Sequence, residues 1–296
     1  MIKIFYTFCL LFLISCSNSA TNSSMLWEIT SPSMQKVSYL FGTFHTKDPK
    51  LSRLPFLITS KLKKSQRLYT EIPMTSKSTQ EIFLFSKMTH PITIKQRLHP
   101  KTIKLLRKQL QAYKLPYTLK TLKPFKTWAI ALMLSNQKED THYTDMLFMD
   151  EKIVAYAKKE HIQQASLETP IEQLRYFDSL SVSLQEQFLL TMLTKEKDSA
   201  YEDALKAWYR KGKAQGFLAL QKHFASKNPR QQKLDKILTQ GLLIARNLRF
   251  TRRIHILLEN NSSLHYFFAI GAGHMSGKKG ILEQLRQQGY TIKKIN

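Results

Sequence analysis

The stretch "AIGAGHMSGKKG", residues 269–280, decides the fold class because it sets a glycine-rich turn between a strand pattern and a helix pattern. Before it, "LHYFFAIG" (264–271) is the aromatic and β-branched run typical of a buried strand. After it, "ILEQLRQQG" has apolar residues at helical spacing and ends at Gly289, a natural helix cap. The closing "YTIKKI" predicts a last strand. The motif is therefore a strand-to-helix turn, the place where ligand sites collect in open α/β sheets.

The same alternation of strand and helix patterns runs through the rest of the chain. Strand patterns occur at "VSYLFG" (37–42), "RLYTEI" (67–72) and "QQASLE" (163–168). Apolar residues recur at helical spacing over 102–112 and 234–259. This alternation predicts an α/β fold with a central mixed sheet and flanking helices, formed by residues 26–296 as one domain.

The middle of the chain, around residues 76–139, predicts a largely helical and basic insertion. The whole chain has a net charge of +25, and residues 82–138 contain no Asp or Glu. A solvated helical face explains this run, and so does a surface that lies against anionic lipid headgroups. Nucleic acid is not an expected partner, because the run lacks interleaved stacking aromatics and a recognition motif.

The N-terminus, "MIKIFYTFCLLFLISCSNS", has the pattern of a secretory signal. Lys3 precedes an apolar run over residues 4–14 that is too short to span a membrane. The order Leu-Ile-Ser-Cys at 13–16 is that of a bacterial lipobox, which predicts a signal peptide over 1–15, acylated Cys16 and a flexible tether over 16–25. An ordinary signal peptide, with Cys16 incidental, is the alternative. We expect an exported chain anchored by lipid in the cell envelope, at the outer membrane or periplasm rather than in the cytoplasm.

Two G-x-x-H turns follow predicted strands, one at Gly42 and His45 and one at Gly271 and His274. If the two strands are neighbours in one sheet, the two imidazoles come together. The glycines, including Gly273, fit neither a dinucleotide turn nor a Walker loop. We expect them to turn the backbone sharply and to leave His274 facing an open cleft.

Seven segments together resemble the TraB/GumN family, which is related to the Tiki proteases. They are "LWEI", "YLFGTFHTKDP", "LYTEI", "FMDEKIVAYAKK", "LETPIEQLRYFDSLS", "IARN" and "AIGAGHMSGKKGILEQLRQQGY". The resemblance runs from about Leu26 to Tyr290. It implies a metal-dependent hydrolase in which the two G-x-x-H histidines and a glutamate form the site, with a peptide or protein as substrate.

The resemblance also implies a role for individual side chains. The implied metal ligands are His45, His274 and Glu71. The pattern matches Glu168 equally well, so either glutamate can be the ligand and the other the general base. Further site residues implied are Asp150, Asn247 and Arg246, the last as a group that holds a substrate carboxylate or oxyanion. The chain departs from the pattern in lacking a glycine before Asp150 and in its basic middle.

Two imidazoles and one carboxylate are a common shell for a catalytic divalent metal such as Mn²⁺, Co²⁺ or Zn²⁺. Simpler explanations exist for each group. Glu168 precedes a capping box at Thr169–Glu172 and can favour the helix dipole, while Glu71 can be a surface acid and Arg246 a salt-bridge partner. Serine and cysteine hydrolysis are not expected, since no G-x-S-x-G elbow is present and the mature chain would lack a usable thiol. A non-catalytic lipoprotein of the same superfamily, which binds haem, another ligand or a partner protein, is the alternative function.

Overall fold

The computed structural model describes residues 24–90, 92–112, 117–136, 146–194 and 199–295. The predicted signal peptide (1–15), Cys16 and most of the predicted tether (16–25) lie outside these residues. No helix in the described ranges is both long and apolar enough to cross a membrane.

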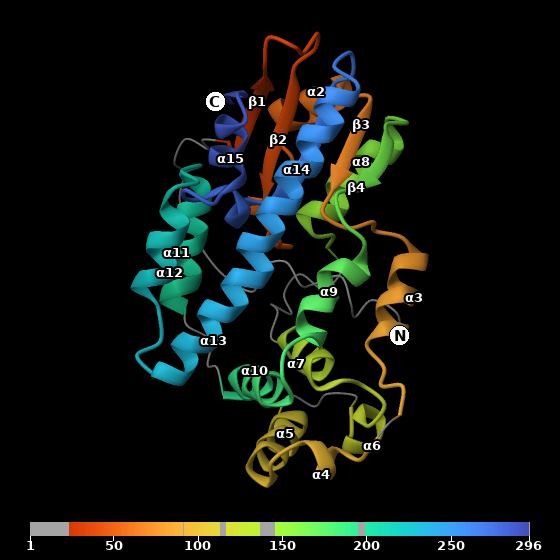
Figure 1. Ribbon diagram of the computed structural model, residues 1–296, viewed down its shortest axis with the longest axis vertical. Coiled ribbons are helices and arrows are strands. Elements are labelled where there is room, and N and C mark those ends of the chain that lie inside the picture. The colour runs from red at the N-terminus through yellow and green to blue at the C-terminus, as the bar shows by residue number, and fades with distance from the viewer. Residues whose placement is uncertain (1–23, 91, 113–116, 137–145, 195–198, 296) are drawn as a thin grey trace.

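A six-stranded mixed sheet forms the upper half of the molecule in Figure 1. Its strands are β1 (Leu26–Thr30), β2 (Ser38–Thr43), β3 (Arg67–Thr70), β4 (Gln163–Ser166), β5 (Tyr266–Gly271) and β6 (Thr291–Ile295), in the order β4-β3-β5-β2-β1-β6. The four strands from β4 to β2 are parallel, whereas β1 is antiparallel to both its neighbours. The predicted mixed α/β sheet is confirmed, and β1 is a strand that the periodicity did not predict.

Helices cover the sheet and build a second, wholly helical lobe below it (Figure 1). Those that pack with the sheet core are α1 (Pro49–Ser52), α2 (Phe56–Lys64), α8 (Met149–Lys159), α11 (Ser199–Arg210), α12 (Gly216–His223), α14 (Ala245–Asn260), the 3₁₀ turn η3 (Ala272–Met275) and α15 (Ile281–Gln287). The lobe contains α3 (Ser76–Phe85), α4 (Ile94–Arg97), α5 (Pro100–Ala112), α6 (Leu119–Leu122), α7 (Thr127–Asn136), α9 (Pro170–Asp178), α10 (Val182–Thr194) and α13 (Pro229–Thr239). A π-helical turn, η2 (Gln240–Ile244), joins α13 to α14.

The helical lobe extends beyond the insertion expected at residues 76–139. Its buried core includes Phe177 of α9, Phe188 of α10 and Leu234 of α13 as well as side chains from α3 to α7. These apolar faces cover one another because no strand reaches this part of the described chain. The lobe is therefore built from three separate stretches of sequence, α3 to α7, α9 with α10, and α13, that share one core.

Within the lobe, α5 explains how a basic segment can pack. Ile103, Leu106 and Leu110 are buried at spacings of three and four, as an amphipathic helix requires. Lys104 and Lys108 lie exposed on the opposite face. The cations of this helix are thus solvated, and its apolar stripe supplies the packing.

The sheet topology brings the two G-x-x-H turns to one edge. Strands β2 and β5 are parallel neighbours, with Gly42 opposite Ile270 and Thr43 opposite Gly271. Strand β3 lies on the other side of β5, and β4 lies beside β3. The carboxyl ends of all four strands therefore meet at one edge of the sheet, where His45, Glu71, Glu168 and His274 follow them.

Candidate functional site

Two glutamates lie side by side where β3 and β4 end. Glu71 directly follows β3, and Glu168 follows β4 after Leu167. The amide of Glu168 donates to the carbonyl of Glu71 at 2.8 Å, which extends the pairing of the strands past their ends. Both side chains are buried, with 9% of Glu71 and 2% of Glu168 exposed. Two carboxylates buried so close together require a cation.

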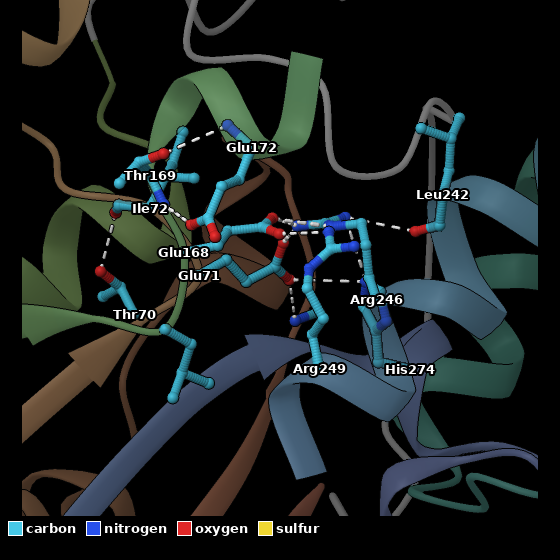
Figure 2. A network of polar contacts seen from close by, with 12 residues as sticks. Thr70, Glu71, Ile72, Glu168, Thr169, Glu172, Leu242, Arg246, Arg249 and His274 are labelled. Carbon is cyan, nitrogen blue, oxygen red and sulfur yellow. Dashed lines mark hydrogen bonds and ion pairs between the residues drawn. The ribbon is translucent and has the colours of Figure 1, made fainter. Parts of the chain in front are cut away.

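Arg246 of α14 supplies that cation (Figure 2). Its Nη2 donates to Glu71 Oε2 at 2.6 Å, and its Nε donates to Glu168 Oε1 at 2.7 Å. Its Nη1 faces the carbonyl of Leu242 and the imidazole of His274, each at 3.4 Å. Every guanidinium nitrogen thus faces a protein acceptor, so a substrate oxyanion would have to displace one of them. The salt-bridge explanation of Arg246 matches this geometry.

The helices α13, η2 and α14 follow one another without a break and place Arg246 at the sheet edge (Figure 1). The π-helical turn η2 contains Gly241, and a Cβ placed there would lie 1.9 Å from Cζ of Tyr176. The Tyr176 hydroxyl donates to the carbonyl of Ile237 at 2.5 Å, and this hydrogen bond holds the Tyr176 ring against Gly241. A π turn changes the register of the residues after it, and such turns are frequent at functional sites. Nothing in the helical periodicity of 234–259 indicated this turn.

His274, on η3, is the third group of this centre, and it is buried with 2% exposure. Its Nδ1 lies 2.5 Å from Asn247 Oδ1, so Nδ1 carries the proton and donates. Its Nε2 lies 3.9 Å from Glu71 Oε1. Burial lowers the pKa of His274 to about 4, with Arg246 acting in the same direction and Glu71 opposing both. The imidazole is therefore neutral near pH 7, with its lone pair toward Arg246 and Glu71.

The burial of His274 corrects the expectation that the glycines leave it in an open cleft. The glycines serve close packing instead. The Gly271 amide donates to Glu71 Oε1 at 2.7 Å, and a Cβ on Gly42 would lie 3.2 Å from Cα of Ala272. Gly273 lies buried within the η3 turn. In the 269–280 segment, the left-handed backbone that needs glycine occurs at Gly277, with a φ of 78°.

His45 lies at the neighbouring strand end and has different partners. Its Nδ1 lies 3.2 Å from Asp150 Oδ2, and its ring stacks on Phe148 with centroids 3.9 Å apart. Asp150 is the second residue of α8, which is fixed to the β2 turn by the contact of the Phe44 amide with Met149 Sδ at 3.3 Å. Asp150 therefore orients His45, which fits the supporting role that the resemblance implies.

The predicted metal shell of His45, His274 and Glu71 is not assembled in this arrangement. Among the described residues, no three His, Cys, Asp or Glu side chains form a group that could hold a metal ion. His274 and Glu71 adjoin, but the guanidinium of Arg246 lies against both. His274 by itself has the features of a ligand, because it is neutral and the side-chain amide of Asn247 orients its ring. The donor set as a whole does not fit a three-ligand centre.

Two further arginines of α14 belong to the centre and were not singled out from the sequence. Arg249 Nη2 donates to Glu168 Oε2 at 2.9 Å. Arg253 Nη2 donates to Glu172 Oε1 at 2.6 Å, and this hydrogen bond lowers the pKa of Glu172 to about 2. Together with Arg246 these residues recur at spacings of three and four, so a search for charge along one helix face would have found them.

A sequence profile of the TraB/PrgY/gumN family matches residues 25–294. A zebrafish protein named Metalloprotease TIKI2 is 44% identical over 61 residues, which are 21% of this chain and 12% of that protein. Two proteins named Metalloprotease TIKI homolog align more fully. The sponge Amphimedon queenslandica homolog is 24% identical over 95% of this chain and 63% of its own length, and the Nematostella vectensis homolog is 22% identical over 92% and 67%. The chain thus spans at most about two thirds of these relatives. No solved structure matches it.

Proposed function

The chain belongs to the TraB/PrgY/gumN family, and from this premise we propose that it is a metal-dependent hydrolase that cleaves a peptide or protein. The metalloprotease names of its relatives support the reaction class. Metal dependence rests on those names, because the donor set described above does not fit a three-ligand centre.

One observation carries the proposal, and it is the buried, neutral and oriented imidazole of His274 beside Glu71. An ion pair between glutamate and arginine needs no imidazole for its stability. A neutral imidazole of fixed tautomer beside a carboxylate, at the carboxyl ends of four parallel strands, is what proton transfer requires. His274 Nε2 and the carboxylates of Glu71 and Glu168 are groups there that can accept a proton. Asn247 holds the tautomer, and Arg246 forms hydrogen-bonded ion pairs with both glutamates.

The test is cleavage of a diverse peptide library by the purified chain, with Mn²⁺, Co²⁺ or Zn²⁺ added and with EDTA, alongside the metal content of the protein by mass spectrometry. We expect cleavage that EDTA abolishes and that His274→Ala or Glu71→Gln lowers by at least about 100-fold. His90→Ala, at an exposed histidine, is the matched control and should be as active as the wild type. Cleavage that persists in His274→Ala, or none with any ion, contradicts the proposal.

A non-catalytic haem- or ligand-binding protein is the second candidate. The observation that favours it is that the Arg246 guanidinium already neutralises both buried carboxylates and contacts His274. Titration with haem separates the candidates. A Soret shift that His45→Ala or His274→Ala removes, together with no peptide cleavage, supports binding without turnover.

We also propose that the chain is exported and lipid-anchored through Cys16, and that the exposed cations of α5 lie against anionic headgroups. Mass spectrometry of the N-terminal peptide tests acylation, since Cys16→Ser removes the acceptor. Sedimentation of that unacylated variant with phosphatidylglycerol vesicles tests the basic face. Binding that falls with salt, and falls further in Lys104→Gln/Lys108→Gln, supports the contact, whereas equal binding to phosphatidylcholine vesicles contradicts it.

A further inference from the structure

A cavity of about 440 Å³ lies away from the Glu71–Arg246–His274 centre, between β2, α1, α2 and α11. Its volume lies in the range of small-molecule sites. The apolar part of its wall that is not already buried includes Leu54, Phe56 and Leu57. Contact between this wall and water is unfavourable, and an apolar group that covers the wall removes that cost.

The charged residues that line this cavity all have the same sign. They are Lys50, Arg53 and Arg210, and no Asp or Glu lines it within the described residues. The Nη2 atom of Arg210 is buried and finds no hydrogen-bond partner in the described part of the chain. A buried donor left without an acceptor is costly, and each one in a folded protein needs an explanation. An acceptor that enters with a ligand would supply it.

A second buried cation, Lys206, lies near Arg210 on the same helix. Lys206, one turn before Arg210 on α11, is 1% exposed, and its Nζ lies 4.0 Å from Asp48 Oδ2. Its pKa is lowered, chiefly by burial and slightly by Arg210, while Asp48, Glu202 and Asp203 act to raise it. An anion beside Arg210 would reduce the repulsion between Arg210 and Lys206.

We propose that this cavity binds a fatty acid, with its acyl chain against Leu54, Phe56 and Leu57 and its carboxylate on the guanidinium groups of Arg210 and Arg53. A carboxylate matches a guanidinium in geometry and charge. A bare inorganic anion would leave the apolar wall uncovered, and an uncharged hydrocarbon would leave Arg210 Nη2 unsatisfied. Both parts of the ligand are therefore needed.

The bound acid would touch the strand end that carries His45. Met149 and Tyr209 line the cavity as well. The Tyr209 hydroxyl donates to the carbonyl of Gly42 at 2.9 Å, and Met149 precedes Asp150, the partner of His45. This site is independent of the proposed hydrolase function, because it needs neither His274 nor Glu71.

The experiment is calorimetric titration of the full-length Cys16→Ser chain, which cannot carry its own acyl group on Cys16, with dodecanoate, dodecanol and inorganic phosphate. We expect dodecanoate to bind, and dodecanol and phosphate to bind at least about tenfold more weakly. Arg210→Gln should weaken dodecanoate binding at least about tenfold. Arg53→Gln, at an exposed position that cannot disturb the core, should weaken it in the same direction.

The matched control is Arg230→Gln, which removes the same charge from an exposed position on α13. It should leave the affinity for dodecanoate unchanged. Equal losses in Arg230→Gln and Arg210→Gln would show attraction to net charge alone, and would overturn the proposal. Failure of dodecanoate to bind, or phosphate binding as tightly as dodecanoate, would overturn it as well.

Discussion

The guanidinium of Arg246 lies 2.6 Å from the carboxylate of Glu71 and binds Glu168 at the same time. This one side chain ties α14 to the ends of β3 and β4. It also stands between Glu71 and His274, the two predicted metal ligands that adjoin. The stability of the sheet edge and the chemistry of the site therefore depend on the same contact.

Replacing Arg246 by methionine should lower the free energy of unfolding by about 3–5 kcal/mol, because it removes the cation that pairs with both buried carboxylates and leaves Glu168 with Arg249 alone. Urea denaturation at pH 7 measures the loss. The variant that also carries Glu71→Gln and Glu168→Gln should recover much of it, since no buried charge remains. Arg286→Met, which breaks an exposed pair with Glu283, is the control and should cost about 1 kcal/mol or less. A similar cost for both single variants would contradict this account.

Asn247 should set the tautomer of His274, because its Oδ1 lies 2.5 Å from Nδ1. In Asn247→Leu the buried Nδ1–H loses its acceptor, at a cost of about 1–3 kcal/mol, and the proton should redistribute between the two ring nitrogens. The ¹⁵N chemical shifts of the imidazole measure that redistribution. Asn247→Asp keeps an acceptor in place and should retain the wild-type tautomer. Unchanged shifts in Asn247→Leu would show that another group fixes the ring.

The local features of the fold were predictable because they depend on neighbours in sequence. The strand patterns before Gly42 and Gly271 correspond to β2 and β5, and the capping box at Thr169–Glu172 opens α9 as predicted. Strand β1 was not predicted, although its five residues make it longer than β3 and β4, which were predicted. The convergence of four strand ends followed from the rule for parallel sheets.

The partners within the site could not be read from the sequence in the same way. Two identical G-x-x-H turns predict two equivalent histidines, yet His45 pairs with Asp150 on α8 and His274 pairs with Asn247 on α14. Each pairing depends on how a distant helix packs against the sheet edge. The position of Arg246 depends further on the π turn η2, which side-chain periodicity does not reveal.

The π turn itself makes a prediction at Gly241, where a methyl group would overlap the ring of Tyr176. Gly241→Ala should destabilise the chain by at least about 1–3 kcal/mol through overpacking. In Gly241→Ala/Tyr176→Ala the overlap is gone, so the double variant should lose less than the sum of the two single losses. Thermal denaturation of the four proteins measures this coupling, and strict additivity would contradict it.

Gly289 provides a contrast, because nothing lies within 4 Å of a Cβ placed there and its φ is 90°. Gly289→Ala should cost roughly 1–2 kcal/mol through backbone conformation alone. Gly289→Asn should cost less, because asparagine tolerates the left-handed region. Equal losses for Ala and Asn would show that side-chain packing, rather than backbone conformation, decides this position.

The pair of Glu172 and Arg253 predicts a pH dependence of stability. Hydrogen bonding to Arg253 lowers the pKa of Glu172 from 4.5 to about 2, so the folded chain holds this carboxyl ionised where the unfolded chain protonates it. The contribution of the pair is therefore complete above pH 4.5 and is lost as the pH falls toward 2. Because both side chains are more than a third exposed, solvent screening limits the contribution of the pair to roughly 0.2–1 kcal/mol.

Urea denaturation of the wild type and of Glu172→Gln, at pH 7 and at steps down to pH 3, measures this contribution. The difference between their free energies of unfolding should shrink below pH 4.5. Glu283→Gln, whose partner Arg286 lies 3.5 Å away, serves as the exposed control. A Glu172→Gln difference that stays constant across this pH range would mean that the pair does not hold the carboxylate ionised.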